Sequence, residues 1–414
     1  MKPTFSIFDE LKLSSSFFLD RVTPALLYFV PFLIIINYGS NTNVDTFSLY
    51  YSLFNSFVAI ALGLTTSVKY FSAKENNRNI HLEVIILCLV ISSLSAYLYF
   101  ISVENRIPLT LYDKKVTYLF LLAIPMVSLF YFIASINEGN LKVANNNRSN
   151  SISLLVFIVA LVIIEYVLSN ILFSICLSFL ITRGIMLLIL MMKSELSILP
   201  IRNIDFTLIK KIIIHGTPIT LLFFAQKYIQ TEGLLRISEN GDSASLFQMI
   251  LTISLFFNLY SNAVSTNGFI QLSKNSININ LKNQFLYSIS MCFLAFIMLI
   301  ISFEALDGLL IKTIINKEVL FHQLEAFKYF IYLFIASDML FIIAIFYSRG
   351  VGDNFRVQCL WCISIALGYI IISDNINIKN ILVVFSISAL IASIYGVLFV
   401  IRKQGELQRE ANKI

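Results

Sequence analysis

Four ionisable residues lie within long apolar stretches of this sequence, where an isolated charge is costly and therefore indicates function. Arg183 and Lys227 are cations that could bind an anion such as a phosphate group. Glu165 and Asp338 are carboxylates. A carboxylate removed from water is either protonated or paired, and both states suit a site that couples an ion to another event.

Other polar residues add to these candidates. Lys227 would share one helix face with Gln230 and Thr231, which follow it by three and four residues. Arg21 precedes the first apolar stretch and could meet an anion as it enters. The candidate substrate-binding residues are therefore Arg183, Lys227, Gln230 and Arg21, and the candidate ion-coupling residues are Asp338 and Glu165. Asparagines recur along another stretch and would either line a polar cavity or mediate helix packing: Asn258, Asn262 and Asn267.

Other chemistries lack support in the sequence. The three histidines are far apart, and no zinc spacing, nucleophile elbow, phosphate loop or dinucleotide fingerprint is present. Cys359 and Cys362 have the spacing of a redox motif, but they lie in an apolar stretch where a thiol behaves as a small hydrophobe. We therefore expect no catalytic residues, no metal, no cofactor and no enzymatic activity, and any uphill transport would draw on an ion gradient.

Composition defines the elements that must position these residues. Hydrophobic residues make up 58% of the 414 residues and charged residues only 13%, and the apolar runs have the length of about 20 residues that crosses a bilayer. The sequence predicts an all-α, polytopic membrane protein with no separate soluble domain and no removable signal peptide. The twelve predicted spans are 22–38, 46–68, 82–101, 117–136, 151–169, 171–192, 212–229, 245–270, 284–303, 327–347, 355–373 and 380–401.

The basic residues predict the orientation of the chain. Most of the 30 lysines and arginines fall on alternate connections, including Lys69 and Lys74 after the second span and the tail after residue 401. The positive-inside rule therefore places both termini in the cytoplasm. The connection at 103–116 is an exception, since it carries three basic residues on the opposite side. The placement of the basic residues on alternate connections favours a membrane protein over a nucleic-acid partner.

A short repeat divides the sequence in two. The segment 21–29 matches the segment 215–223 in a Thr-Pro pair, a Leu and a Phe at a constant offset of 194 residues. Parallel six-helix halves are a known transporter plan, so we expect lobes at 1–200 and 201–414 with a substrate site between them. Pro24 and Pro218 would then lie in the first turns of helices, whereas Pro31 and Pro125 would kink spans.

The charged candidates also have ordinary structural interpretations. Lys227 could extend its ammonium group to the outer membrane surface. Arg183 could pair with Glu165 of the adjacent span, and Arg21 could serve only to orient the chain. Because Arg183 and Lys227 fall in different halves, they could instead share one anion between the lobes.

Several motifs resemble one transporter superfamily. They are a Gly-x-Pro that opens the second half (Gly216-Thr217-Pro218), a long span that ends in Gln271-Leu272-Ser273-Lys274, and the segment 309–318 before the tenth span. The chain resembles the multidrug/oligosaccharidyl-lipid/polysaccharide exporter superfamily, and within it the Wzx-type O-antigen flippases. Asn316 departs from the family pattern, which usually has Gly there.

The resemblance implies a MATE-like fold of two six-helix lobes in the bacterial inner membrane. It also implies that the chain moves an undecaprenyl-diphosphate-linked oligosaccharide to the outer leaflet by alternating access. The implied partners are this lipid-linked oligosaccharide and membrane lipids, with a polysaccharide polymerase and a chain-length regulator as further candidates and no nucleic acid. A multidrug or metabolite antiporter of the same superfamily and an O-antigen polymerase are the alternative functions.

Overall fold

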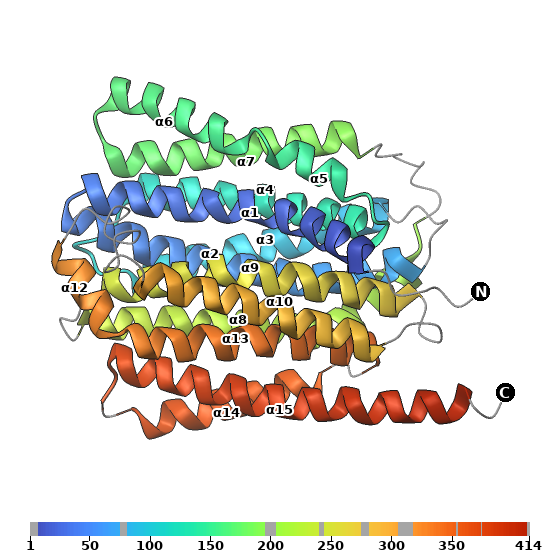
Figure 1. The fold of residues 1–414 in the computed structure, drawn as a ribbon. Coiled ribbons are helices and arrows are strands. Elements are labelled where there is room, and N and C mark those ends of the chain that lie inside the picture. Colours follow the sequence, from blue (N-terminus) through green and yellow to red (C-terminus); the bar gives the residue numbers. More distant parts are fainter. Residues whose placement is uncertain are drawn as a thin grey trace. The chain divides into compact units, whose positions relative to one another are not determined.

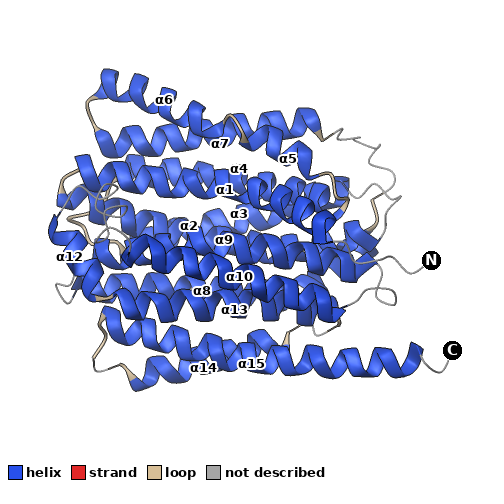
Figure 2. Ribbon diagram, viewed as in Figure 1, coloured by secondary structure: helices blue, strands red, loops and turns tan. Residues whose placement is uncertain are grey.

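The computed structural model describes residues 7–74, 81–194, 204–239, 244–274, 281–304, 318–352, 355–373 and 375–411. Every regular element in these ranges is a helix, as Figure 2 shows. The predicted all-α class is therefore confirmed.

The helices belong to two compact units. One unit comprises Thr23–Gln248 and the other comprises Met1–Val22 with Met249–Ile414. The helices are α1 (Ile7–Tyr38), α2 (Asn41–Lys74), α3 (His81–Arg106), α4 (Lys114–Gly139), α5 (Val143–Asn150), α6 (Ser153–Leu168), α7 (Ile171–Lys193), α8 (Phe206–Glu239), α9 (Ala244–Lys274), α10 (Leu281–Glu304), α12 (Glu318–Ala326), α13 (Lys328–Gly350), α14 (Arg356–Ile371) and α15 (Ile378–Ala411). Helix α8 lies in the same unit as α2, and the division into lobes at residue 200 stays a prediction.

Helix lengths agree with a multi-pass membrane protein. Within the described ranges, ten segments are long and apolar enough to cross a membrane, and two shorter apolar helices lie at Ala25–Tyr38 and Arg356–Ile371. Each of these twelve segments overlaps one predicted span. Neighbouring helices pair along their length, as α6 does with α7 and α14 does with α15 (Figure 1).

Helix α2 is the centre of the unit Thr23–Gln248, where it packs against α3, α4 and α8. Its contact with α8 depends on glycine. A Cβ atom on Gly63 would lie 2.3 Å from the Cα atom of Thr220, and a Cβ atom on Gly216 would lie 2.7 Å from a methyl carbon of Leu64. Small residues of this kind let the backbones of membrane helices approach closely.

The expected placement of two prolines is wrong. Pro218 lies inside α8, which begins at Phe206, and Pro24 lies inside α1, which begins at Ile7. The cause in α8 is an N-terminal cap, because a carboxylate oxygen of Asp205 accepts hydrogen bonds from the backbone N–H groups of Thr207 and Leu208. The cap starts the helix well before its apolar part. Pro125 lies inside α4, as expected.

A buried ion pair joins α2 to α4. The Lys69 ammonium nitrogen lies 2.8 Å from a carboxylate oxygen of Glu138, and their side chains are only 8% and 6% exposed. We expected Lys69 to lie in a cytoplasmic connection, but α2 continues to Lys74 and carries it into the helix packing. The close approach of Gly139 to the backbone of Lys69 brings the two helices together at this level.

Removing one partner of this pair should destabilise the protein strongly. Glu138→Gln leaves the Lys69 charge buried without its carboxylate, which costs roughly 3–5 kcal/mol. The double variant Lys69→Met, Glu138→Leu should recover most of that loss, because neither charge is then buried. Thermal unfolding of the purified protein in detergent measures both effects.

The control for this measurement is Arg236→Gln, which breaks a more exposed ion pair with Glu232 on α8 and should cost about 1 kcal/mol or less. A Glu138→Gln variant as stable as this control would show that Lys69 and Glu138 do not form a buried ion pair.

Candidate functional site

Lys227 and Gln230 form a polar pair on α8. The Lys227 ammonium group donates a hydrogen bond of 2.9 Å to the side-chain oxygen of Gln230, which is buried. One turn after Lys227, the hydroxyl of Thr231 donates a hydrogen bond of 3.0 Å to the Lys227 carbonyl. The predicted shared face of these three residues is therefore present, and it holds one half-buried cation.

Two serines of α2 extend this polar group. The hydroxyl oxygen of Thr231 lies 2.7 Å from that of Ser52 and 2.9 Å from that of Ser56. All three hydroxyls are buried between α2 and α8. The sequence analysis did not select the serines, although their spacing of four residues within an apolar stretch was a usable signal.

Arg183 is buried within α7, with only 1% of its surface exposed. The centre of its guanidinium group lies 5.0 Å from the centre of the Phe179 ring, within the range of a cation–π interaction. The Phe179 ring in turn contacts Phe54 of α2 and Phe120 of α4. Arg183 therefore belongs to the aromatic contact among α7, α4 and α2.

Helix α2 separates the surroundings of Arg183 from those of Lys227. Phe54 faces α7, whereas Ser52 and Ser56 face α8. Phe54 is two residues from each serine, which is about 200° around a helix. The polar group beside Lys227 and the aromatic group beside Arg183 thus lie on opposite sides of α2. The structure does not bring the two cations into one cluster.

Glu165 does not pair with Arg183. Helices α6 and α7 form a hairpin, in which Ser169 reverses the chain in the left-handed conformation and Asn170 caps α7. Glu165 lies near the end of α6, so it is level with the first turns of α7. Arg183 lies 12 residues after Ile171, the first residue of α7, which is about 18 Å along the helix at ~1.5 Å per residue. The structural alternative proposed for Arg183 from the sequence is therefore wrong.

Asp338 lies midway along α13 and contacts α9. Its carboxylate accepts a hydrogen bond from the side-chain amide of Asn258. The same amide donates a hydrogen bond of 3.0 Å to the hydroxyl of Ser254, one turn earlier on α9. Asn258 thus serves the packing of α9 against α13 and also supplies a neutral partner for the carboxylate. This group of side chains could hold a proton or a small cation.

Arg21 contacts α9 at another level. Its guanidinium group donates a hydrogen bond of 3.2 Å to the hydroxyl of Thr266, which in turn donates to the side-chain oxygen of Asn262. Both partners belong to the same unit as Arg21. The contact anchors the middle of α1 against α9 and leaves the predicted binding role of Arg21 untested.

Glu232 precedes Arg236 by four residues, and this spacing predicts a structural ion pair on one helix face. The pair is confirmed by a distance of 3.2 Å between a carboxylate oxygen and the Nε atom. The structure adds Arg106, whose guanidinium lies 2.6 Å from the other oxygen of Glu232 and stacks over Tyr228. Arg106 belongs to the connection that carried basic residues on the unexpected side. The positive charge of Arg106 is paired with the carboxylate of Glu232 on α8.

His215 has a role that the sequence did not indicate. Its Nδ1 atom lies 2.9 Å from the hydroxyl of Ser67, and its ring stacks on Tyr70 at 4.8 Å. This contact holds α8 against α2 on the side of the two glycines. No group of three metal-ligating side chains occurs in the part of the chain that the structure describes.

Comparisons with known proteins identify the fold. No protein-family model and no curated protein matches this sequence. Solved structures do match it over nearly its full length. One is an outward-facing multidrug resistance MATE family transporter of the MOP superfamily, with 14% identity and a TM-score of 0.75 over 97% of this chain and 96% of the other.

Two further structures give the same result. A MOP superfamily transporter from Pyrococcus furiosus has 13% identity and a TM-score of 0.78, with 96% of each chain covered. A eukaryotic MATE transporter has 12% identity and a TM-score of 0.72, with 97% of this chain and 99% of the other covered. The predicted MATE-like architecture is confirmed: this chain has the fold of the MATE transporters of the MOP superfamily.

Proposed function

We propose that this protein is a transporter that moves an undecaprenyl-diphosphate-linked oligosaccharide across the bacterial inner membrane by alternating access, driven by an ion gradient. The fold supports transport, and the observation that carries the substrate class is the half-buried Lys227 with its partner Gln230 on an apolar helix. A cation held within a membrane span is costly unless it faces a polar ligand or cavity. A diphosphate supplies the opposite charge.

Lys227 is the principal anion ligand in this proposal. Gln230 holds its ammonium group, and the hydroxyls of Thr231, Ser52 and Ser56 provide polar surface one turn away. Arg183 and Arg21 remain candidate contacts for the diphosphate or the sugars. Because α2 lies between the Arg183 and Lys227 groups, they would contact different parts of a large substrate or act at different stages of its passage.

Asp338 is the ion-coupling residue in this proposal. Its neutral partner Asn258 can donate a hydrogen bond to the ionised carboxylate and can also accept one from the protonated form after rotation of the amide. The site therefore tolerates both protonation states. Glu165 remains the second candidate carboxylate.

Drug antiport is the second candidate function. It is favoured by the match to a structure described as a multidrug resistance MATE transporter. The Pyrococcus furiosus structure is described as having a binding pocket of reversed polarity that suggests a different function. Pocket charge is therefore the property that separates the two proposals, and Lys227 is the residue to test.

Lys227→Gln should reduce surface polysaccharide about tenfold or more in the native host, because the loss of a charge-assisted hydrogen bond costs about 1.5–3 kcal/mol. Lipid-linked oligosaccharide should accumulate on the cytoplasmic face, and the amount of protein in the membrane should not change. Lys227→Arg should retain part of the activity, since it keeps the charge.

Arg236→Gln is the matched control, because it removes a cation from the same helix at a more exposed position. Arg183→Gln, measured in parallel, tests whether the second cation contributes. Normal polysaccharide in Lys227→Gln, together with a change in ethidium efflux, would exclude lipid-linked substrate and favour drug antiport.

Asp338→Asn should abolish the dependence of transport on the ion gradient and leave substrate binding intact, because it removes the ionisable group and keeps its size. Transport into inverted vesicles with an imposed proton or sodium gradient measures the coupling. Glu165→Gln provides the comparison, and an equal loss in that variant alone would assign coupling to α6.

Both termini should lie in the cytoplasm, as the distribution of basic residues predicts. Reporter fusions after Lys74, Lys193 and Lys413 should all give a cytoplasmic signal. A periplasmic signal at Lys193 would contradict this orientation.

A further inference from the structure

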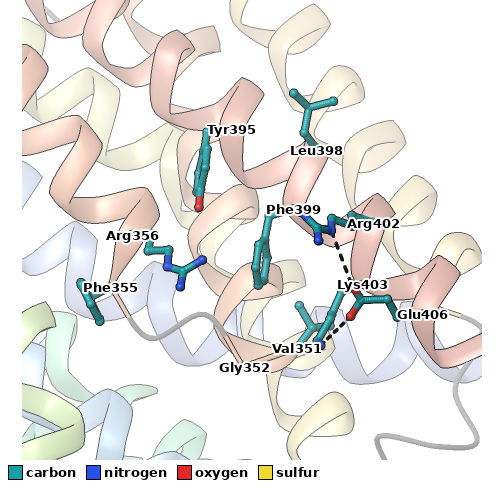
Figure 3. Close-up of a pocket in the computed structure, with 10 residues that line it drawn as sticks. All are labelled: Val351, Gly352, Phe355, Arg356, Tyr395, Leu398, Phe399, Arg402, Lys403 and Glu406. Carbon is teal, nitrogen blue, oxygen red and sulfur yellow. Dashed lines mark hydrogen bonds and ion pairs between the residues drawn. The ribbon is translucent and has the colours of Figure 1, made fainter.

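A basic pocket lies at one end of the unit that contains Met249–Ile414. It has a volume of 680 Å³ and is formed where the turn after α13, the start of α14 and the last part of α15 meet. Its lining residues are Val351, Gly352, Phe355, Arg356, Tyr395, Leu398, Phe399, Arg402, Lys403 and Glu406. Figure 3 shows these side chains. None of them belongs to the transport site proposed above.

Positive charge predominates in this pocket. Among the described lining residues, Arg356, Arg402 and Lys403 are opposed only by Glu406. Glu406 accepts a hydrogen bond of 2.7 Å from Lys403 and lies 3.4 Å from Arg402. The hydrogen bond from Lys403 lowers the pKa of Glu406, so this carboxylate is ionised at neutral pH. Two positive charges remain in excess.

These charges are accessible to a ligand. The side chain of Arg402 is 83% exposed, and the side chains of Lys403 and Glu406 are each 42% exposed. Arg356 comes from a different helix and extends toward the Phe399 ring in Figure 3. An anion in the pocket would therefore meet guanidinium and ammonium groups from both α14 and α15.

The ends of the apolar spans place the pocket at the expected level of the lipid headgroups. The apolar span on α15 ends at Lys403, the span on α13 ends at Gly350, and the apolar helix α14 begins at Arg356. Tyr395, Leu398 and Phe399 lie one to two turns farther into the span of α15. Leu398 is 61% exposed. The pocket thus has a basic end at the interface and an aromatic and apolar end toward the hydrocarbon.

We propose that this pocket binds the headgroup phosphate of an anionic phospholipid, with the phosphate between Arg356 and Arg402 and the start of an acyl chain against Leu398 and Phe399. Basic pockets between membrane helices bind anionic lipid headgroups in this way. A free phosphate ion would use the basic end alone, so the apolar end favours a lipid. In the predicted orientation the lipid belongs to the cytoplasmic leaflet. The proposal does not depend on the transported substrate.

The test is thermal unfolding of the full-length protein in detergent with added short-chain lipids. Trp361 is the single tryptophan, and it is buried in α14 against Phe341, so its fluorescence reports the unfolding of this unit. Dihexanoyl-phosphatidylglycerol should raise the midpoint in a saturable manner. Dihexanoyl-phosphatidylcholine and inorganic phosphate should not. An equal shift with inorganic phosphate would overturn the assignment to a lipid.

Arg356→Gln with Arg402→Gln should weaken the response to phosphatidylglycerol about tenfold or more. Lys210→Gln with Lys211→Gln removes the same charge from exposed positions on α8 and should leave the response unchanged. Arg402→Lys should retain most of it. The single variant Arg356→Gln, at an exposed position, repeats the test if the double variant is unstable. An unchanged response in this variant would overturn the proposal.

Discussion

The fold depends on one constraint: a polar group within an apolar helix must find its partner inside the protein, because the surrounding hydrocarbon offers none. Many hydroxyls meet this constraint within their own helix. Ser48, Thr182 and Ser386 each donate a hydrogen bond of 2.7 Å to the carbonyl four residues earlier. Other polar groups reach neighbouring helices, as the side-chain amides of Asn137 and Asn258 do. Those longer contacts determine which helices pack together.

Helix α2 shows how the constraint organises a whole unit. It pairs Lys69 with Glu138 of α4, joins Ser52 and Ser56 to Thr231 of α8, and contacts His215 through Ser67. Each contact is specific in direction, whereas apolar packing between membrane helices is not. A helix with several such contacts has a fixed rotation about its axis. The rotation of α2 is what places the Arg183 and Lys227 groups on opposite sides of it.

The sequence predicted the helical spans well, because apolar length is a local property that a bilayer imposes on every span. It also predicted the pair of Glu232 with Arg236, which lies within one helix. Contacts between helices were harder to predict. The partner of Lys69 is 69 positions away, and the register that separates Glu165 from Arg183 depends on the turn at Ser169. The cap at Asp205 moved the start of α8 and with it the place of Pro218.

The exposed apolar face of α6 has an evolutionary consequence. Side chains such as Leu155, Val162 and Tyr166 are largely exposed within the unit, and a lipid environment accepts almost any apolar residue there. At Gly63 and Gly216, where α2 contacts α8, almost no larger residue is accepted, since a single Cβ atom would collide with the facing helix. Neutral drift can therefore replace most of the surface of such a protein without disturbing its architecture. Few positions are fixed by geometry, which agrees with the match of this fold to solved structures at only 12–14% identity.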